Sequence, residues 1–230
     1  LTPSGGPTHF RISLKSNPQA PSSRPHLSVH LVLDVSGSME GESIDRARLA
    51  AQNLVDKLDP ADDFSLVTFS SDAKVILQDA PIATRKSVLK QTISNLVPEG
   101  GTNISEGLRL GYAQAQTRSI PSDAVRVVLL LSDGKANAGI TQHQSLSQMA
   151  LEAFQNGIQT STFGLGADYD GALMSGLAAD GAGGYYYLRD GSQIAPALTT
   201  ELEKRLDPVA TAVEVRIRLK RGVDLLRVYG

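Results

Sequence analysis

The chain has 230 residues, of which 41% are hydrophobic and 20% charged, with a formal net charge of −2 and no cysteine. These values indicate one large globular domain, or one domain with a small appendage. They exclude disulfides, thiolate catalysis and cysteine metal sites, and the scattered basic residues offer no patch for nucleic acid. The sequence contains no apolar run of about 18 residues, so it predicts no membrane span.

The predicted elements follow a regular order along the chain. Apolar and polar residues alternate over 9–15, which predicts a half-buried strand, and a proline-rich loop comes next. From residue 27 onward, apolar runs typical of strands alternate with segments of helical period. The expected strands are 27–35, 63–69, 73–77, 125–131, 158–164 and 184–188. The expected helices are 42–58, 84–96, 104–117, 144–156, 171–179 and 192–206, the last one capped by Ser192.

This alternation predicts an α/β fold over residues 27–206. The fold is doubly wound, with a mostly parallel central sheet, one antiparallel edge strand at 73–77 and helices on both faces. The segments 9–15 and 211–229 have the two-residue period of exposed strands. We expect them to form a small β appendage built from both ends of the chain.

One buried strand ends in an unusual set of oxygen side chains. The segment 27–35 contains Asp34, and Ser36 and Ser38 follow it at alternate positions. Two further candidates lie downstream, namely Thr102 in a glycine-rich loop before a helix and Asp133 directly after a second apolar strand. Carboxylates and hydroxyls are hard ligands that suit Mg²⁺ or Ca²⁺ better than zinc or copper. Ligands in α/β sheets gather outside the carboxyl ends of the strands, so the five side chains predict a cation site there.

Each of these motifs also has a plainer interpretation. Asp34, Ser36 and Ser38 could form a helix cap, and Asp133 with Gly134 could be a simple turn. The loop at 100–103 lacks the lysine of a phosphate-binding loop. The four histidines have no metal-ligand spacing. Tyr185, Tyr186 and Tyr187 are either an interaction surface or sheet packing, and Asp168 with Asp170 is expected to be a polar loop rather than a second cation site.

The same residues resemble the von Willebrand factor type A family, to which the integrin inserted domain belongs. The metal-ion-dependent adhesion site of that family reads D-x-S-x-S, then a threonine in a loop, then an aspartate after a central strand. Asp34, Ser36, Ser38, Thr102 and Asp133 match all five positions. The resemblance covers about residues 27–206 and extends to bacterial members and to the inter-alpha-trypsin inhibitor heavy chains. It implies a Rossmann-like fold and a site that binds a divalent cation, with Mg²⁺ favoured over Ca²⁺ or Mn²⁺.

The resemblance implies a binding module rather than an enzyme. The cation would dock an aspartate or glutamate of a partner protein, as in cell adhesion. Two alternatives stay open, namely a scaffold domain of a larger protein and a metal-dependent hydrolase with Asp34 as nucleophile or ligand. The hydrolase lacks a general base near these loops, since the nearest histidine in sequence to Asp133 is His143. The chain starts at Leu1 and ends on a strand-like segment, from which we expect a piece of a longer protein. The sequence does not fix the compartment; a secreted or membrane-anchored parent protein is favoured over a cytoplasmic one, and an intracellular assembly role stays open.

Overall fold

The structure, a computed structural model, describes residues 24–83, 85–121 and 124–206, together with residues 6, 218, 219 and 221–224. One compact unit comprises Ser23–Asp207. The segments predicted to form the β appendage, 9–15 and 211–229, fall outside the described residues apart from 218, 219 and 221–224. The appendage therefore stays a prediction. Within the part that is described, no helix is long and apolar enough to cross a membrane.

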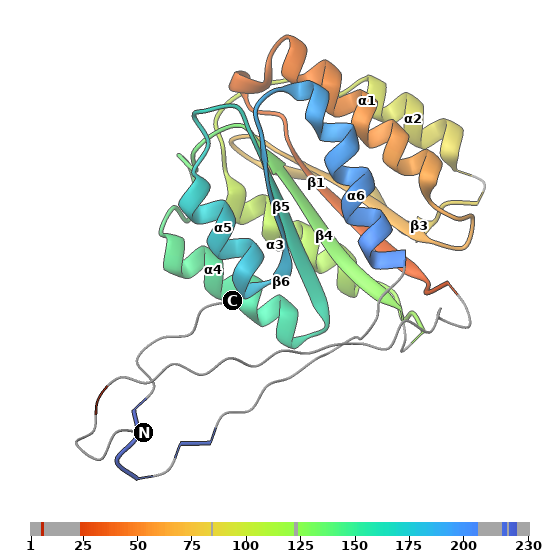
Figure 1. Ribbon diagram of the computed structural model, residues 1–230. Helices are drawn as coiled ribbons and strands as arrows, with labels where there is room; N and C mark the ends of the chain where they lie inside the picture. The colour runs from red at the N-terminus through yellow and green to blue at the C-terminus, as the bar shows by residue number, and fades with distance from the viewer. Residues whose placement is uncertain are drawn as a thin grey trace. The chain divides into compact units, whose positions relative to one another are not determined.

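The centre of the unit is a six-stranded sheet in the order β3-β2-β1-β4-β5-β6 (Figure 1). All neighbouring strands are parallel except β3, which runs antiparallel to β2 at one edge. This confirms the predicted fold class. The strands are β1 (Leu27–Asp34), β2 (Asp63–Phe69), β3 (Ala73–Pro81), β4 (Val125–Ser132), β5 (Ile158–Leu165) and β6 (Ala182–Leu188).

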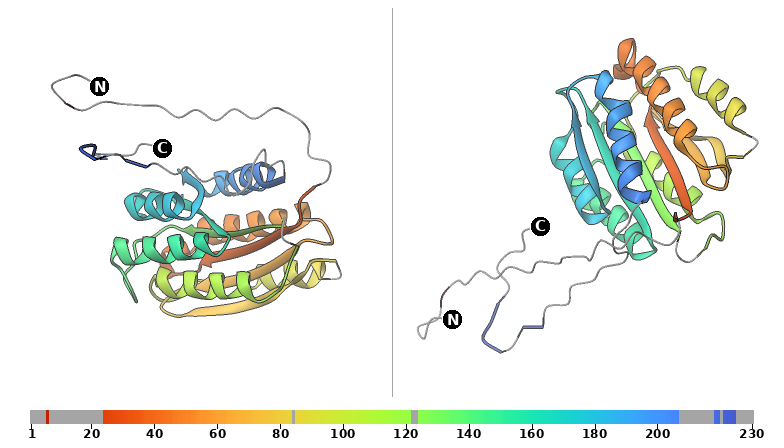
Figure 2. Two further views of the ribbon diagram at one scale, coloured as in Figure 1. Left: turned by 90° about the horizontal axis from the view of Figure 1, so that it is seen from below. Right: turned by 45° about the vertical axis from the view of Figure 1, so that its right-hand side comes forward.

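Helices cover both faces of the sheet. One face carries α1 (Glu42–Lys57), α2 (Lys86–Ser94) and α6 (Ile194–Leu206), and the other carries α3 (Ile104–Gln116), α4 (His143–Gln155) and α5 (Gly171–Asp180). In the right-hand view of Figure 2, α1 and α6 lie in front of the strands. Two short 3-10 helices, Gly37–Met39 and Gly191–Gln193, complete the described elements. The second one corrects a prediction, because Asp190 rather than Ser192 supplies the capping side chain there, and α6 begins only at Ile194.

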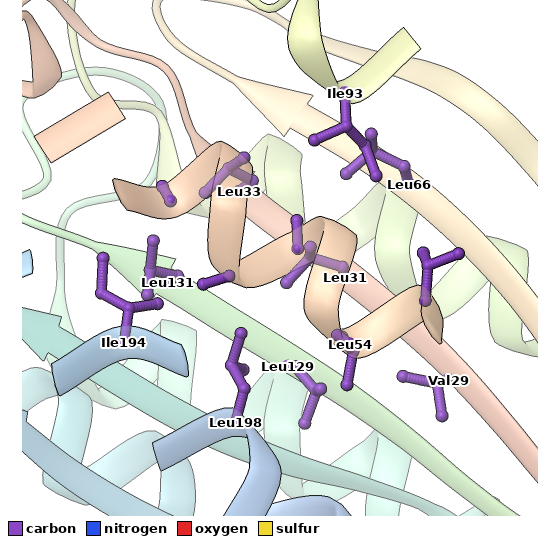
Figure 3. Packing of buried hydrophobic residues seen from close by; sticks show 14 of the residues in the cluster. Val29, Leu31, Leu33, Leu54, Leu66, Ile93, Leu129, Leu131, Ile194 and Leu198 are labelled. Atoms are coloured by element: carbon purple, nitrogen blue, oxygen red, sulfur yellow. The ribbon is translucent and has the colours of Figure 1, made fainter. Parts of the chain in front are cut away.

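The strand β1 is buried along its whole length because helices lie on both of its faces. Its alternate side chains therefore enter two different cores. Val29, Leu31 and Leu33 pack with α1 and α6, as Figure 3 shows, whereas Val32 faces α3. His30 is bonded on both ring nitrogens, to Ser28 Oγ and to Ser65 Oγ, each at 2.8 Å. Burial lowers the pKa of His30 to about 3, so this histidine is a neutral structural residue.

Helix α3 packs closely on the sheet because it presents two glycines to it. A Cβ atom at Gly111 would lie 2.5 Å from Val32 Cγ2, and one at Gly107 would lie 2.8 Å from the ring of Phe69. Only glycine leaves room for this approach. The helix begins directly after the loop that carries Thr102, so its seat on β1 and β2 also fixes the position of that loop.

Candidate metal centre

The five predicted ligands lie in three loops at one end of the sheet. Asp34 is the last residue of β1, Asp133 follows the last residue of β4, and Thr102 precedes α3. β1 and β4 are neighbours, and the chain runs outward from them in opposite directions, to β2 and β3 on one side and to β5 and β6 on the other. This is the topological switch point, where the loops after the two central strands separate and leave room for a ligand.

Asp34 is buried at the centre of the cluster. Its side chain is 0% exposed, and its Oδ1 accepts a hydrogen bond from the backbone N–H of Ser36 at 2.8 Å. The other oxygen accepts a short hydrogen bond from the hydroxyl of Ser132. These two bonds fix the carboxylate on the end of the strand and bring the turn that carries Ser36 and Ser38 over it.

The two serines connect β1 to the loop after β4. Ser36 Oγ lies 3.0 Å from Ser38 Oγ, and the Ser38 hydroxyl donates to Asp133 Oδ1 at 2.6 Å. Thr102 is buried beside them, since a Cβ atom at Gly134 would lie 3.3 Å from Thr102 Oγ1 and 3.7 Å from Ser38 Oγ. The structure therefore brings all five side chains together, although they come from three separate stretches of the sequence.

Hydrogen bonds from backbone N–H groups hold the three loops against one another. Gly37 donates its N–H to the carbonyl of Gly100 at 3.1 Å. Thr102 and Asn137 are joined twice, from Thr102 N–H to Asn137 Oδ1 at 2.8 Å and from Asn137 N–H to the Thr102 carbonyl at 3.0 Å. Each loop thus has a partner in another loop, which preorganises the oxygen atoms before anything binds.

The site carries two carboxylates in an environment that disfavours their charge. Burial raises the pKa of Asp34 to about 6 in spite of its hydrogen bonds to Ser132 and Ser36. Burial likewise raises the pKa of Asp133, against the hydrogen bond from Ser38. A cation placed among these oxygens would relieve this cost, because it stabilises the ionised carboxylates. The donor set fits a divalent cation of the hard class, with two carboxylates and three hydroxyls.

Sequence reasoning missed two supporting residues. Ser132 is the last residue of β4 and bonds Asp34 across the strand pair, and Asn137 bonds Thr102 across two loops. The sequence could have indicated Ser132 but not Asn137. Ser132 precedes Asp133 at the end of β4, and β4 pairs with β1, so Ser132 must lie beside the end of β1.

Two other sequence candidates, His143 and Asp170, have structural partners. His143 Nε2 bonds Asp170 Oδ2 at 2.8 Å, and Asp170 Oδ1 also accepts from the N–H of Leu173 at 3.0 Å, which caps α5. Among the described residues, no group of three or more histidine, aspartate or glutamate side chains is arranged to hold a metal. A cation at the cluster would therefore depend on the serine and threonine hydroxyls.

Comparisons with known proteins find relatives over most of the chain. The family model of the von Willebrand factor type A domain matches residues 28–201. Among curated proteins, YfbK of Escherichia coli (strain K12) is 29% identical over 91% of this chain and 36% of its own length. Human inter-alpha-trypsin inhibitor heavy chain H4 is also 29% identical, over 81% of this chain and 21% of its own length. This chain thus spans less than half the length of these relatives.

Solved structures share the fold. A von Willebrand factor type A protein from Catenulispora acidiphila superimposes with a TM-score of 0.71 at 21% identity, over 81% of this chain and 44% of that one. Proximal thread matrix protein 1 from the mussel byssus gives a TM-score of 0.64 at 20% identity, over 78% of this chain and 48% of that one. In that structure zinc occupies the metal-ion-dependent adhesion site (MIDAS) motif. The family match over residues 28–201, on the fold described above, shows that this chain belongs to the von Willebrand factor type A domain family.

Proposed function

We propose that this domain is a metal-ion-dependent protein-binding module. Asp34, Ser36, Ser38, Thr102 and Asp133 hold one divalent cation, Mg²⁺ before Ca²⁺ or Mn²⁺, at the end of β1 and β4. The observation that carries the proposal is the convergence of these five oxygen side chains, linked by the chain of hydrogen bonds from Ser36 through Ser38 to Asp133.

The bound cation supplies a Lewis-acidic point of contact at the protein surface. With two carboxylates and three neutral hydroxyls around it, a divalent cation retains affinity for a further anionic oxygen. An aspartate or glutamate of a partner protein offers such an oxygen. The residues of this chain hold the cation and shape the surface around it, with Asn103, Lys135 and Asn137 in the surrounding loops.

The surroundings of the cluster favour binding over turnover. A hydrolase needs a general base within hydrogen-bond reach of the reacting group. The hydrogen bonds described for the side chains of Asp34 and Asp133 come from serine residues, and the nearest histidine in sequence to Asp133, His143, bonds Asp170 at the start of α5 instead. The proposal of a non-enzymatic module rests on this arrangement, and the secreted or membrane-anchored setting of the parent protein stays a prediction.

Titration calorimetry of Mg²⁺ into metal-stripped protein tests the site. We expect one binding site in the wild type and at least a tenfold weaker one in Asp133→Ala, because the substitution removes one of two carboxylates. Asp180→Ala is the matched control, since Asp180 is an exposed aspartate at the far end of α5, and we expect it to bind like the wild type. Circular dichroism of each variant establishes that the fold is retained. Equal Mg²⁺ affinity in Asp133→Ala and wild type would refute the assignment.

A further inference from the structure

The last strand of the sheet leaves one of its two sides open. β6 pairs with β5, and no other strand lies beside it in the part of the chain that the structure describes. The Leu188 carbonyl accepts a hydrogen bond from the N–H of Gly166 at 2.8 Å, so the backbone of Leu188 faces β5. Backbone groups alternate between the two sides of a strand, so the backbone of Tyr186 also faces β5. The N–H and C=O groups of Tyr185 and Tyr187 therefore point outward, away from the sheet.

This open edge lacks the features that keep edge strands from pairing between molecules. Lysine, proline and irregular pairing are common features of this kind. The opposite edge strand, β3, has all three, namely Lys74, Pro81 and two shifts of register against β2. β6 contains neither a charged residue nor a proline, and its register shift lies before Tyr185. The segment Tyr185–Leu188 is thus a regular, uncharged edge.

Contacts on both faces of the strand hold this edge in place. On one face, the ring of Tyr187 stacks on that of Tyr169 with the centroids 5.8 Å apart, and the hydroxyls of Tyr185 and Tyr169 are 2.6 Å apart. On the other face, Tyr186 stacks on Phe163 with the centroids 4.8 Å apart. An edge that is fixed in advance loses little conformational entropy when a strand binds to it.

We propose that β6 pairs with β6 of a second copy of this chain, antiparallel, about a two-fold axis at Tyr186. In this arrangement Tyr185 lies opposite Tyr187 of the second copy, and each donates its N–H to the carbonyl of the other. The axis repeats this pair, so four hydrogen bonds form and every outward group of the two residues is used. The side chains of Tyr185 and Tyr187 share one face, so two cross-strand tyrosine pairs form as well.

The free backbone groups of the edge select this register. A shift by one residue would set Tyr185 against Tyr186, whose backbone already faces β5. A shift by two residues in one direction would bring in Arg189, whose N–H already donates to Gln193 Oε1 at 2.6 Å. A shift by two in the other direction would bring in Gly183, in the irregular part of β6. Pairing centred on Tyr186 uses only free groups on the regular part of the strand.

The charges at the two ends of β6 also suit a second copy. Arg189, which is exposed, would lie opposite Gly183 of the second copy and therefore near the end of its α5, where Asp180 is exposed. A cation is stabilised both by this carboxylate and by the C-terminal end of a helix. Asp190, in the same turn as Arg189, accepts a hydrogen bond from the N–H of Ser192 at 3.0 Å. The two-fold axis therefore brings opposite charges together at both ends.

The pairing joins two sheets into one continuous sheet. Because the paired strands are antiparallel, the ends of β1 and β4 that carry the candidate metal centres face in opposite directions in the two copies. The inference goes beyond the proposed function and does not depend on a bound cation. All of its tests are therefore done in EDTA, which prevents association through the metal centre.

Sedimentation velocity of the 230-residue chain measures the association. The edge of one short strand gives a small interface, so we expect a dimer with a dissociation constant on the order of 10–100 μM. Tyr187→Pro removes the outward N–H and leaves the bonds to β5 intact, because proline is tolerated on the outer side of an edge strand. The matched variant Tyr187→Ala loses the same ring but keeps this N–H. We expect Tyr187→Pro to dimerise at least about tenfold more weakly than Tyr187→Ala, because the axis doubles the lost hydrogen bond.

Phe154→Ala is the control for loss of an exposed aromatic ring elsewhere, since Phe154 lies on α4, and we expect it to associate like the wild type. Circular dichroism of each variant establishes that the fold is retained. A second measurement, with substitutions that keep every backbone N–H, does not depend on how Tyr187→Pro folds.

Introduced cysteines report the register, because the chain has none of its own. Opposite residues that exchange two hydrogen bonds have Cα atoms about 5.5 Å apart, within the range of about 4.4–6.8 Å that a disulfide spans. Tyr185→Cys and Tyr187→Cys should therefore cross-link with each other under mild oxidation. Each variant alone should not, because the two copies of one position are offset by two residues along the strands, which sets their Cα atoms about 8.7 Å apart. Isotope labelling of one variant identifies the mixed dimer by mass.

Three results would overturn the inference. A wild-type chain that stays monomeric up to about 500 μM would exclude the second copy and leave the edge to a strand of another protein. A dimer that Tyr187→Pro and Tyr187→Ala weaken equally would form through another surface. Equal cross-linking in the mixture and in each cysteine variant alone would contradict the axis at Tyr186. Failure of the chain to bind Mg²⁺ would refute the proposed function and leave this inference standing.

Discussion

Replacing Gly111 by alanine should destabilise the domain, although alanine is the better helix former. Gly111 lies inside α3, where alanine is favoured over glycine by about 1 kcal/mol on an exposed helix face. Here the added Cβ atom would lie 2.5 Å from Val32 Cγ2, whereas carbon atoms in ordinary contact are about 3.5–4.0 Å apart. Val32 is buried at 0% exposure on the fully buried strand β1 and cannot move aside.

Helix α3 must therefore shift away from the sheet by roughly 1 Å, or Val32 must leave its preferred rotamer. Overpacking costs about 1–3 kcal/mol, and a contact roughly 1 Å inside the ordinary distance belongs in the upper part of this range, about 2–3 kcal/mol. We therefore expect a net loss of about 1–2 kcal/mol after the gain of about 1 kcal/mol in helix propensity. For a domain of this size the loss corresponds to a fall in melting temperature of about 2–8 °C.

Urea denaturation followed by circular dichroism measures this loss, with Gly176→Ala as the matched control. Gly176 also lies inside a helix, α5, but its added Cβ atom would meet only the rotatable hydroxyl of Ser147, at 3.0 Å. We expect Gly176→Ala to be neutral or to stabilise the domain by up to about 1 kcal/mol. If Gly111→Ala were as stable as the wild type, or if both variants lost the same free energy, close packing of α3 on β1 would not explain the glycine.

Substitutions at three further positions test other features of the fold. Burial and the charge of Asp63 raise the pKa of Asp79 to about 6 in the folded protein, above its ordinary 3.8. Between these two pH values the carboxyl is ionised in the unfolded chain but still protonated in the folded one. The free energy of unfolding therefore falls as the pH rises from about 4 to about 6. Asp79→Asn should therefore match the wild type near pH 4 and be about 1–2 kcal/mol more stable at pH 8, as pH-dependent urea denaturation would show; a constant difference would contradict this. Glu201→Ala should lower the free energy of unfolding by about 3 kcal/mol in the same assay, because it leaves the largely buried Arg205 without its charge partner. A loss below about 1 kcal/mol would contradict this role of the ion pair. Asn103→Ala should cost about 1 kcal/mol by removing the cap of α3, and Asn103→Asp should restore most of it, since its carboxylate can accept from the Glu106 N–H.

Much of the fold could be predicted because its determinants are local. The strand 27–35 and the helix 42–58 each carry a periodicity that specifies the element before any partner is known. The structure places β1 at Leu27–Asp34 and α1 at Glu42–Lys57, within a residue of these limits. The predicted end of an element is wrong where a capping residue sets it, as at Ser192. Loop geometry, and not the hydrophobic periodicity of the sequence, decides which polar side chain bonds the free backbone N–H groups.

The candidate site is a second case in which local pattern was informative. Asp34, Ser36 and Ser38 are close in sequence, and strand polarity alone brings Asp133 to the same end of the sheet. Their role as metal ligands stays a prediction. The bond from Ser132 to Asp34 and the double link between Thr102 and Asn137 could not be foreseen, since they depend on how separate loops meet.

The sequence by itself determined the α/β class, the order of the elements and the residues that gather at the ends of β1 and β4, because periodicity and strand direction are properties of the chain. Only the tertiary structure decided which of three consecutive tyrosines is partly covered. Tyr185, Tyr186 and Tyr187 are identical in type and consecutive, yet Tyr186 stacks on Phe163 while its neighbours stay exposed at the edge of the sheet. Strand alternation sets which of them share a face, but the pairing of β6 with β5 and the seat of α6 determine which face is covered.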